Sequence, residues 1–358
     1  MFLAWREIKY SKTRFVLIIG VMVLVSYLVF FLTGLAYGLA QDNRLAIDKW
    51  DASGIILNSE ANDNLSASTI EIKEITKLET KSTARLGQSA TVIKKAGSSE
   101  KINSTIFGID STEFLKPSIV SGRMFEKNNE AVVDNSLIEK GIKLGDELEL
   151  SISNTKVKVV GFTDNSKFNT APVIYLNLSD WQLAKFQQSD LTDTGKISGL
   201  VMKNTPSSKL TLDSDKLSYL PIKKFIQAIP GYAAQTLTFG IMIGFLFVIA
   251  AFVIGIFIYV LTLQKRSMFG VMKAEGIPTS YISKSIIAQT FILASVGVAI
   301  GLVLTLITAA VLPPAVPYLT NVLFLSGFAL VLIAVAILGA VFSVGTITKI
   351  DPLTAIGG

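Results

Sequence analysis

The chain has 358 residues, of which 50% are hydrophobic, and its formal net charge is +6. It contains no cysteine, which excludes disulfides, thiolate metal sites and thiol nucleophiles, and no histidine, which removes the usual general base and the commonest metal ligand. The mean hydropathy of +0.53 is too high for an ordinary soluble domain. We therefore expect a membrane protein with no catalytic residues and no metal site.

Charged residues are absent from three long stretches, 15–40, 236–263 and 285–348. A membrane span needs about 20 apolar residues. Pro313, Pro314 and Pro317 divide the last stretch, because proline cannot continue a helix. The sequence thus predicts transmembrane helices at 15–40, 236–263, 285–311 and 321–347, with an external loop at 312–320. A cleavage-like site follows Ala40, but signal-peptide cores run only about 7–15 residues, which favours a retained first helix.

The distribution of charge predicts the orientation. Residues 1–14, 264–284 and 348–358 together carry nine Lys or Arg and three Asp or Glu, whereas residues 41–235 carry 24 of each kind. Because basic residues gather on the cytoplasmic side, we expect both termini in the cytoplasm of a plasma-membrane protein, with residues 41–235 outside. Residues 1–14 would form an amphipathic segment and residues 348–358 a tail. The basic pI reflects this topology and does not indicate a nucleic-acid partner.

Residues 41–235 are long enough for one domain with its own core, and alternating patterns predict an α+β fold. We expect strands at 89–95, 104–110, 131–133 and 171–177, and a hairpin of 147–153 with 156–162. Helices are expected at 68–79, at 135–140 ending at Gly141, after residue 177 with a cap at Ser179 or Asp180, and between residues 221 and 230. An acidic cluster at 146–149 could bind a cation, but alternation places it on a solvated strand edge.

Pairs of glycines four residues apart recur in the spans, a spacing that lets helix backbones approach closely. The pairs are Gly34/Gly38, Gly240/Gly244 and Gly297/Gly301. The first two predict a contact between the first and second helices, within one subunit or across two. No ionisable residue lies inside a span, which argues against an ion-coupled transporter. No Walker A pattern is present, so the energy for any transport would come from another chain.

The segment "QKRSMFGVMKAEGIPTSYI", residues 264–282, stands between the second and third spans. Its apolar and charged residues alternate with a helical period, and Gly276 and Pro278 end the pattern. This predicts an amphipathic helix across the cytoplasmic face, in which Met268 and Phe269 are exposed. An ordinary interfacial loop is the alternative for the segment by itself.

This segment resembles the coupling segment of MacB/FtsX-type ABC permeases, although Met268 replaces the usual Glu. The C-terminal "KIDPLTAIGG" and the segments "GIKLGDELEL" and "KVKVVGF" resemble other parts of the same family. The resemblance implies a homodimeric permease coupled to two separate ATPase chains, which bind ATP and Mg²⁺. The residues it assigns to coupling are Gln264, Lys265, Arg266, Met268, Phe269, Gly270, Met272, Lys273, Ala274, Gly276 and Pro352.

Within that family, the "FFLTGLAYGLAQDN" exit from the first span and the "QK…FGVMKAEGI" variant look most like the haemin-efflux (HrtB-like) permeases of Gram-positive bacteria. This likeness implies export of haemin or a similar amphiphile from the membrane by mechanotransmission. Because the chain has no His and no Cys, it could offer haem iron only oxygen or thioether ligands, and tyrosine is an established ligand type. The candidates are Tyr37, Asp42, Tyr232 and Gln235. Two alternatives stay open, an FtsX-like regulator of a cell-wall hydrolase and a membrane-anchored receptor without an ATPase.

Overall fold

The computed structural model describes residues 12–204, 212, 215–313 and 316–348. The chain divides into two compact units, which we call the membrane unit (1–38 with 236–358) and the inserted domain (39–235). The predicted N-terminal segment lies largely outside the described residues, as does the predicted C-terminal tail with Pro352.

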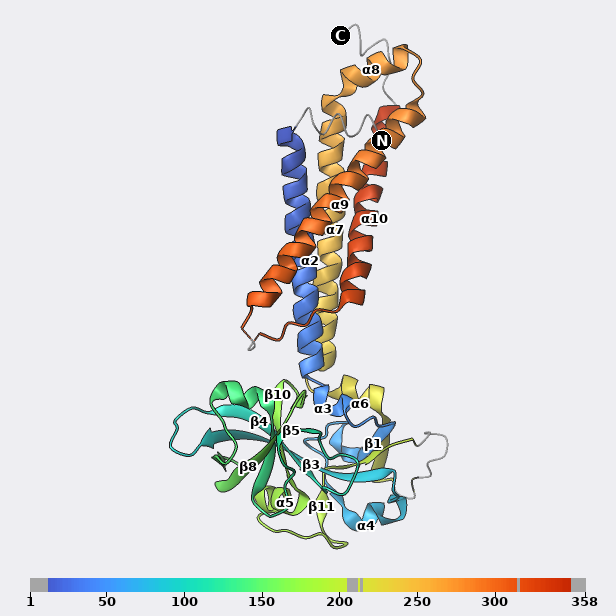
Figure 1. Ribbon diagram of the computed structural model, residues 1–358. Helices are drawn as coiled ribbons and strands as arrows, with labels where there is room; N and C mark the ends of the chain where they lie inside the picture. The colour runs from blue at the N-terminus through green and yellow to red at the C-terminus, as the bar shows by residue number, and fades with distance from the viewer. Residues whose placement is uncertain (1–11, 205–211, 213–214, 314–315, 349–358) are drawn as a thin grey trace. The chain divides into compact units, whose positions relative to one another are not determined.

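Five helices of the described residues build the membrane unit (Figure 1). Their bounds are α2 Lys12–Asp42, α7 Tyr232–Gln264, α8 Arg266–Ala274, α9 Thr279–Val311 and α10 Val322–Thr348. Within the described residues, four of them (α2, α7, α9 and α10) are long and apolar enough to cross a membrane. The predicted membrane fold of four spans, with an α+β domain between the first and second, is confirmed.

The helices extend beyond the uncharged stretches that predicted them. The helix α7 already begins at Tyr232, directly after Gly231, whose φ of +83° ends the preceding turn. The helix α9 begins at Thr279, so part of the predicted 264–284 loop belongs to its first turns. Pro278 directly precedes this helix, a position where the missing N–H costs nothing. Charge content therefore locates the part of a helix in the membrane, while proline and glycine locate its ends.

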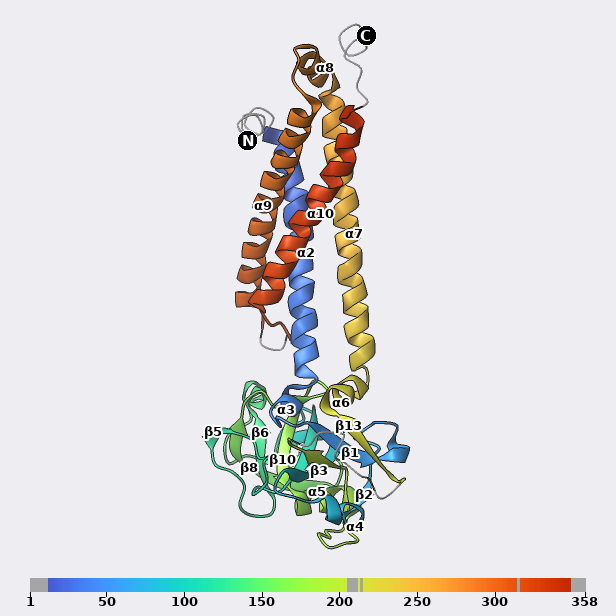
Figure 2. The same cartoon turned by 90° about the vertical axis from the view of Figure 1, so that its right-hand side faces the viewer.

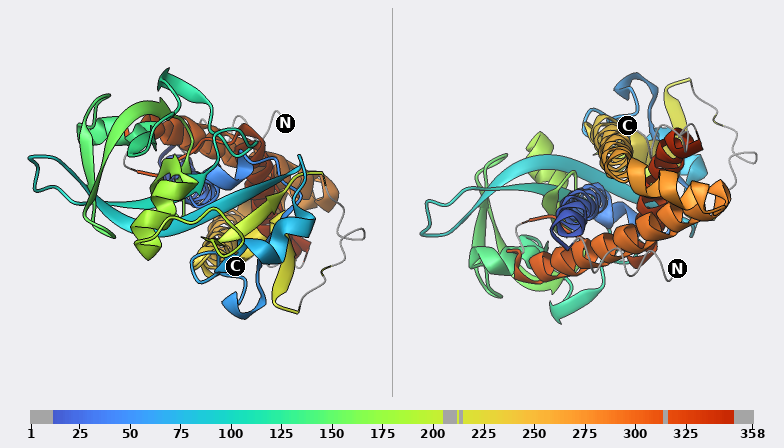
Figure 3. Two further views of the ribbon diagram at one scale, coloured as in Figure 1. Left: turned by 90° about the horizontal axis from the view of Figure 1, so that it is seen from below. Right: turned by 90° about the horizontal axis from the view of Figure 1, so that it is seen from above.

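Among the long helices, α2 contacts α9, α9 contacts α10, and α7 contacts both α10 and α2. In Figure 2, α9 and α7 lie on opposite sides of the membrane unit, with α2 and α10 between them. The right-hand view of Figure 3 shows α2 nearly end-on and α9 running obliquely beside it. A hydrogen bond joins α2 to α9, and glycines of α7 and α10 meet at a crossing. The helix α7 is the least covered span, with 17% of its most apolar window buried against 39% for α2.

Most strands of the inserted domain form one mixed sheet, which has 11 strands within the described residues. The order is β13-β1-β12-β3-β4-β10-β6-β8-β5, with β7 beside β3 and β8, and β9 beside β10. The pairs β4/β10 and β6/β8 are parallel, and the others are antiparallel. The bounds are β1 Gly54–Asn58, β3 Thr83–Lys95, β4 Ile102–Ile109, β5 Ile119–Gly122, β6 Glu130–Asp134, β7 Glu147–Leu150, β8 Thr155–Thr163, β9 Lys167–Phe168, β10 Ala171–Asn177, β12 Gly199–Met202 and β13 Leu217–Pro221. A separate pair joins β2 (Ile70–Glu71) to β11 (Lys196–Ile197).

Short helices cover both faces of this sheet. They are α3 Leu45–Asp48, α4 Ile72–Ile75, α5 Leu178–Phe186 and α6 Ile222–Ala228. Successive strand residues point to opposite faces, so Ile106 joins the core under α4 and α5 while Phe107 joins the core under α3 and α6. Central strands are therefore buried on both sides, as the fully buried β6 illustrates.

The element predictions for this domain are mostly confirmed, including the hairpin of β7 and β8 and a 3₁₀-helix at Asn135–Lys140 that ends at Gly141 (φ +76°). Two are wrong. The helix expected over 68–79 is a two-residue strand, one turn of α-helix and the 3₁₀ turn Thr76–Leu78, because residue 70 pairs with β11. The cap of α5 is Asn177, whose side chain accepts a hydrogen bond from the Ser179 N–H. Asp146 pairs with Lys95 at 2.6 Å, and the described residues contain no cluster of metal-ligand type.

Candidate functional site

The helix α8 carries most of the residues assigned to coupling by resemblance. One of its faces is exposed, and the other packs against the rest of the membrane unit. The helix follows α7 after a single residue, Lys265, and ends at Ala274, two residues before Gly276, whose φ of +84° suits glycine. Met268 and Val271 are both 42% exposed. The spacing of three residues places them together on the outer face of the helix.

Phe269 corrects the sequence prediction of an exposed side chain. It is only 3% exposed and belongs to a core cluster with Ile282 and Ile286 of α9. Gly270 is also buried, and Met272 packs against the same cluster. The inner face of α8 is thus anchored to the helix that follows it, and the apolar surface open to a partner is that of Met268 and Val271.

The charged residues of this segment are placed differently. The ammonium of Lys265 lies 5.6 Å from the ring centre of Phe15 at the start of α2, a cation–π distance. Lys273 is half-buried, while Gln264, Ala274 and Gly276 are exposed. The side chain of Arg266 and all of Pro352 lie outside the described residues.

The glycines of α9 are packed against α2. A β-carbon added at Gly301 would lie 2.0 Å from the Ser26 Oγ, and one added at Gly297 would lie 2.4 Å from the Met22 Cβ. The Ser26 hydroxyl donates a hydrogen bond to the Gly297 carbonyl at 3.3 Å. Gly297 and Gly301 therefore hold α2 and α9 close together, as small residues do in membrane helices.

The other two glycine pairs do not meet each other within the chain. A β-carbon at Gly34 would lie 2.1 Å from the ring of Tyr318, and one at Gly38 would lie 2.1 Å from the Pro317 carbonyl oxygen. Both glycines thus make room for the loop between α9 and α10, whose Leu319 N–H donates to the Gly34 carbonyl at 3.2 Å. Gly240 and Gly244 of α7 are exposed, and a β-carbon at either would meet nothing within 4 Å among the described residues. The predicted contact within one subunit is wrong, and only the contact across subunits stays a prediction.

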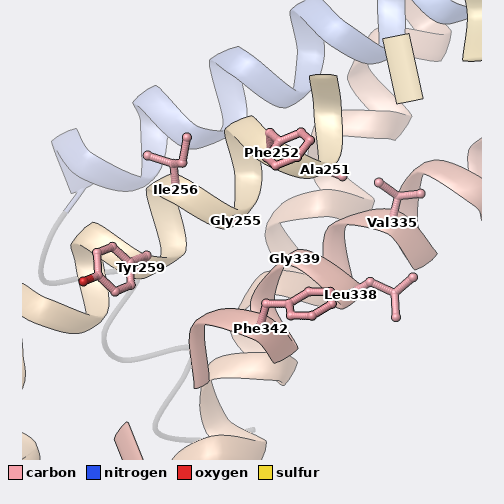
Figure 4. A pocket seen from close by; sticks show the side chains of 9 residues that line it. All are labelled: Ala251, Phe252, Gly255, Ile256, Tyr259, Val335, Leu338, Gly339 and Phe342. Carbon is pink, nitrogen blue, oxygen red and sulfur yellow. The ribbon is translucent and has the colours of Figure 1, made fainter. Parts of the chain in front are cut away.

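A further close contact, between α7 and α10, was not expected from the sequence. A β-carbon at Gly339 would lie 3.0 Å from the Ala251 carbonyl oxygen and 3.3 Å from the Gly255 Cα. The spacing of Ala251 and Gly255, four residues apart, was the signal that could have identified it. Beside this crossing, Phe252 and Phe342 flank an apolar groove of about 540 Å³ (Figure 4).

The four candidate ligand residues have different surroundings. Tyr37 stacks edge-on against Phe324 of α10, with ring centres 5.3 Å apart, in the membrane unit. The other three belong to the inserted domain. The Asp42 carboxylate is held by the Lys167 ammonium at 2.7 Å, which leaves it poorly suited as an iron ligand.

Gln235 and Tyr232 lie near residues that follow α2. The Gln235 amide oxygen accepts a hydrogen bond from the Asn43 side chain at 3.2 Å, while its buried Nε2 has no partner among the described residues. Tyr232 lines a cavity of about 420 Å³ with Arg44. The pKa of the Arg44 guanidinium is raised, first by its hydrogen bonds with Asp48 and also by a hydrogen bond with Tyr232. The structure therefore brings Tyr232 and Gln235 to the same part of the domain and leaves Asp42 in an ion pair.

Four apolar helices, a domain inserted after the first and an amphipathic helix after the second define the chain as a multi-pass membrane protein. Two family models match it, one described as "MacB-like periplasmic core domain" over residues 13–214 and one as "FtsX-like permease C-terminal" over residues 240–352. The chain belongs to the MacB/FtsX-type family of ABC transporter permeases. The predicted family is confirmed.

Relatives match along the whole chain. A Staphylococcus epidermidis protein named as a hemin transport system permease, HrtB, is 28% identical over 372 residues, covering 100% of this chain and 99% of the relative. An uncharacterized ABC transporter permease of Mycobacterium tuberculosis is 25% identical over 369 residues with the same coverage. The extracellular domain of the noncanonic ABC-type transporter YknZ is 14% identical with a TM-score of 0.35, and the match covers 47% of this chain and 98% of that domain.

Proposed function

We propose that this chain is the permease subunit of an ATP-driven exporter that removes haemin or a similar amphiphile from the membrane. The observation that carries the proposal is the division of α8 into an anchored inner face, with Phe269, and an exposed apolar outer face, with Met268 and Val271. Full-length similarity to proteins named as hemin transport permeases supports the substrate class. A separate ATPase chain would bind ATP and Mg²⁺.

The anchored face of α8 suggests how force would pass. An ATPase that docks on Met268 and Val271 would push a helix whose other side is packed into the core of the membrane unit through Phe269. Because packed cores deform little, the displacement would move α9 and α7 as rigid elements. This is the mechanotransmission expected from the family resemblance, with both termini on the cytoplasmic side.

A homodimer, with two ATPase chains, is the assembly that we propose. The helix α7 exposes a long apolar stripe beside Gly240 and Gly244, which includes Leu237, Ile241, Phe245 and Val248. Lipid chains would cover such a stripe as well, but the unoccupied space over two glycines suits a second helix backbone. Close approach of two copies of α7 would place the connections to both inserted domains at the interface.

Tyr37 and Tyr232 remain the candidate iron ligands for a bound haemin. Both offer a phenol oxygen, the type of oxygen ligand that tyrosine supplies to haem iron. Haemin bound through phenolate oxygen should give a high-spin spectrum. The double variant Tyr37→Phe with Tyr232→Phe keeps both rings and should change that spectrum, while an unchanged spectrum would reject these ligands.

The test of the function is ATP hydrolysis by the permease reconstituted in lipid with its ATPase partner. Haemin added to the bilayer should stimulate hydrolysis several-fold, and vesicles loaded with haemin should lose it only when ATP is present. Met268→Asp and Val271→Asp should abolish the stimulation, while Met268→Leu should keep it. Stable complexes that hydrolyse ATP without responding to haemin would reject the substrate, and normal transport by Met268→Asp would reject the docking face.

A further inference from the structure

The inserted domain contains a cavity of about 420 Å³, and Tyr232, a candidate haem ligand, is one of the residues that line it. Its walls come from the start of the domain, at α3, and from its end, at α6 and the first residue of α7. Arg44, Asp48, Asp51 and Lys223 supply the charged groups of the lining. The two segments are distant in sequence, so only the folded domain creates this site.

The lining carries two basic and two acidic side chains, and both acidic ones already pair with a cation, one of which, Lys203, lies outside the lining. The Asp48 carboxylate pairs with Arg44 at 2.7 Å, and the Asp51 carboxylate pairs with Lys203 at 3.0 Å. Lys223 is exposed on α6 and makes no ion pair with the described residues. Each acidic side chain is thus neutralised by a cation, and Lys223 remains as one uncompensated positive charge.

Arg44 is held in a fixed orientation by Asp48. The Arg44 Nε donates to both Asp48 oxygens, at 3.0 and 2.9 Å, and the Nη2 donates to Oδ1 at 2.7 Å. A guanidinium has five N–H donors in a rigid plane. Asp48 takes one edge and Tyr232 a further hydrogen bond, and the remaining donors of the group can bind an anion. Asp48 is therefore a positioning residue for Arg44.

The rest of the lining consists of the polar residues Gln227 and Tyr232 and of four apolar residues. The side chains of Ile47 and Ile226 are buried, and those of Ala52 and Ile222 are half-buried. Such a surface adjoining two cations is complementary to a molecule with a hydrophobic body and an anionic group. Among anions, a carboxylate matches the bidentate geometry of a guanidinium.

We propose that Arg44 and Lys223 bind a carboxylate group of the exported amphiphile, whose hydrophobic body lies against the isoleucine wall. The proposal rests on the proposed export function and adds the chemical feature by which the substrate is recognised. It assigns specificity to the inserted domain, at residues that continue directly from α2 and lead directly into α7.

The test compares haemin, which carries two carboxylates, with haemin dimethyl ester, which has the same ring and iron but no carboxylate. Binding to the purified full-length permease is measured by absorbance titration, and stimulation of ATP hydrolysis is measured in the reconstituted complex. Wild type should bind haemin more tightly than the ester. Lys223→Gln should weaken haemin binding about two- to fivefold, the range of an exposed charge pair, and leave ester binding unchanged.

Lys224→Gln is the matched control, since Lys224 is a neighbouring exposed lysine on α6 outside the cavity lining. Asp48→Asn should reduce the preference for haemin over the ester without changing ester binding. Equal binding of haemin and ester by wild type, or equal effects of Lys223→Gln and Lys224→Gln, would overturn the carboxylate site and leave export intact. Failure of haemin to bind or to stimulate hydrolysis would reject the proposed substrate and this site together.

Discussion

The helices α2 and α7 look alike in sequence and differ in the structure. Each is a long apolar helix that borders the inserted domain in the chain, and each carries a pair of glycines four residues apart. Gly34 and Gly38 of α2 are covered by Tyr318 and Pro317, whereas a β-carbon at either glycine pair position of α7, Gly240 or Gly244, would meet nothing within 4 Å. The glycine pair of α2 is therefore packed against other residues of the chain, and the pair of α7 is open to a partner helix or to lipid.

The same division is found on α8. Phe269 is buried in the core of the membrane unit, and Met268, its neighbour in sequence, is exposed. Substitutions on surfaces that pack within the chain should therefore lower the stability of the folded subunit. Substitutions on exposed surfaces should leave that stability unchanged and reduce only the binding of partner chains or the rate of transport. Four substitution experiments test this distinction.

The largest effect is expected at Gly38. The β-carbon of a leucine there, in its ideal position, would lie 2.1 Å from the Pro317 carbonyl oxygen. This oxygen belongs to the backbone, which cannot move aside easily. Gly38→Leu should therefore destabilise the folded permease by 1–3 kcal/mol or more, about the cost of overpacking a core. Thermal unfolding in detergent measures this. Gly20→Leu, on the same helix with nothing within 4 Å, is the control. Equal melting of the two variants would remove the packing role of Gly38.

The next effect separates the two faces of α8. Phe269→Asp should lower stability by on the order of 3 kcal/mol, because it empties a buried site and places a charge there. Met268→Asp should fold like wild type and lose binding of the ATPase. Melting temperature and co-purification of the two chains distinguish these outcomes. If Met268→Asp melted early, or Phe269→Asp kept wild-type stability, the assignment of inner and outer faces would be wrong.

A smaller effect, confined to function, is expected on α7. Gly244→Leu should leave the stability of one subunit unchanged and reduce haemin export several-fold if two copies of α7 approach at this glycine. Gly327→Leu on α10 is the control, because its surroundings are also open. Disulfide cross-linking of Gly240→Cys, in a chain with no native cysteine, reports the contact directly. Absence of cross-links in active complexes would contradict the α7 interface.

The smallest effect is expected at Ser26. Its hydroxyl joins α2 to α9 through the Gly297 carbonyl, and hydrogen bonds between membrane helices are worth about 0.6 kcal/mol. Ser26→Ala should lower stability by about that amount, measured by unfolding in detergent. Ser326→Ala serves for comparison, because the Ser326 hydroxyl donates only to the Leu323 carbonyl of its own helix. A change at Ser326 as large as the change at Ser26 would show that the interhelical bond contributes nothing.

Much of the fold could be predicted from the sequence. Long uncharged stretches place four spans, and alternation of apolar residues places the strands around 89–95, 104–110 and 156–162. The helix predicted at 68–79 failed because Ile70 pairs with Ile197 of a distant strand, and this long-range pairing overrides the local helical pattern. The cap of α5 was predicted at Ser179 or Asp180 and lies at Asn177. Several polar residues close together in sequence can each serve as a cap, so the sequence does not choose among them.

Hydropathy and helical period are local properties, so they were enough to predict the number of spans, the insertion point of the domain and the amphipathic character of α8. Only the tertiary structure decided which glycine pair meets a loop, that Phe269 points inward, and that Arg44 and Lys223 line one cavity. The physical reason is that lipid and a neighbouring helix are equally apolar. A hydrophobic side chain or a glycine in a membrane helix therefore does not reveal its partner until the packing is known.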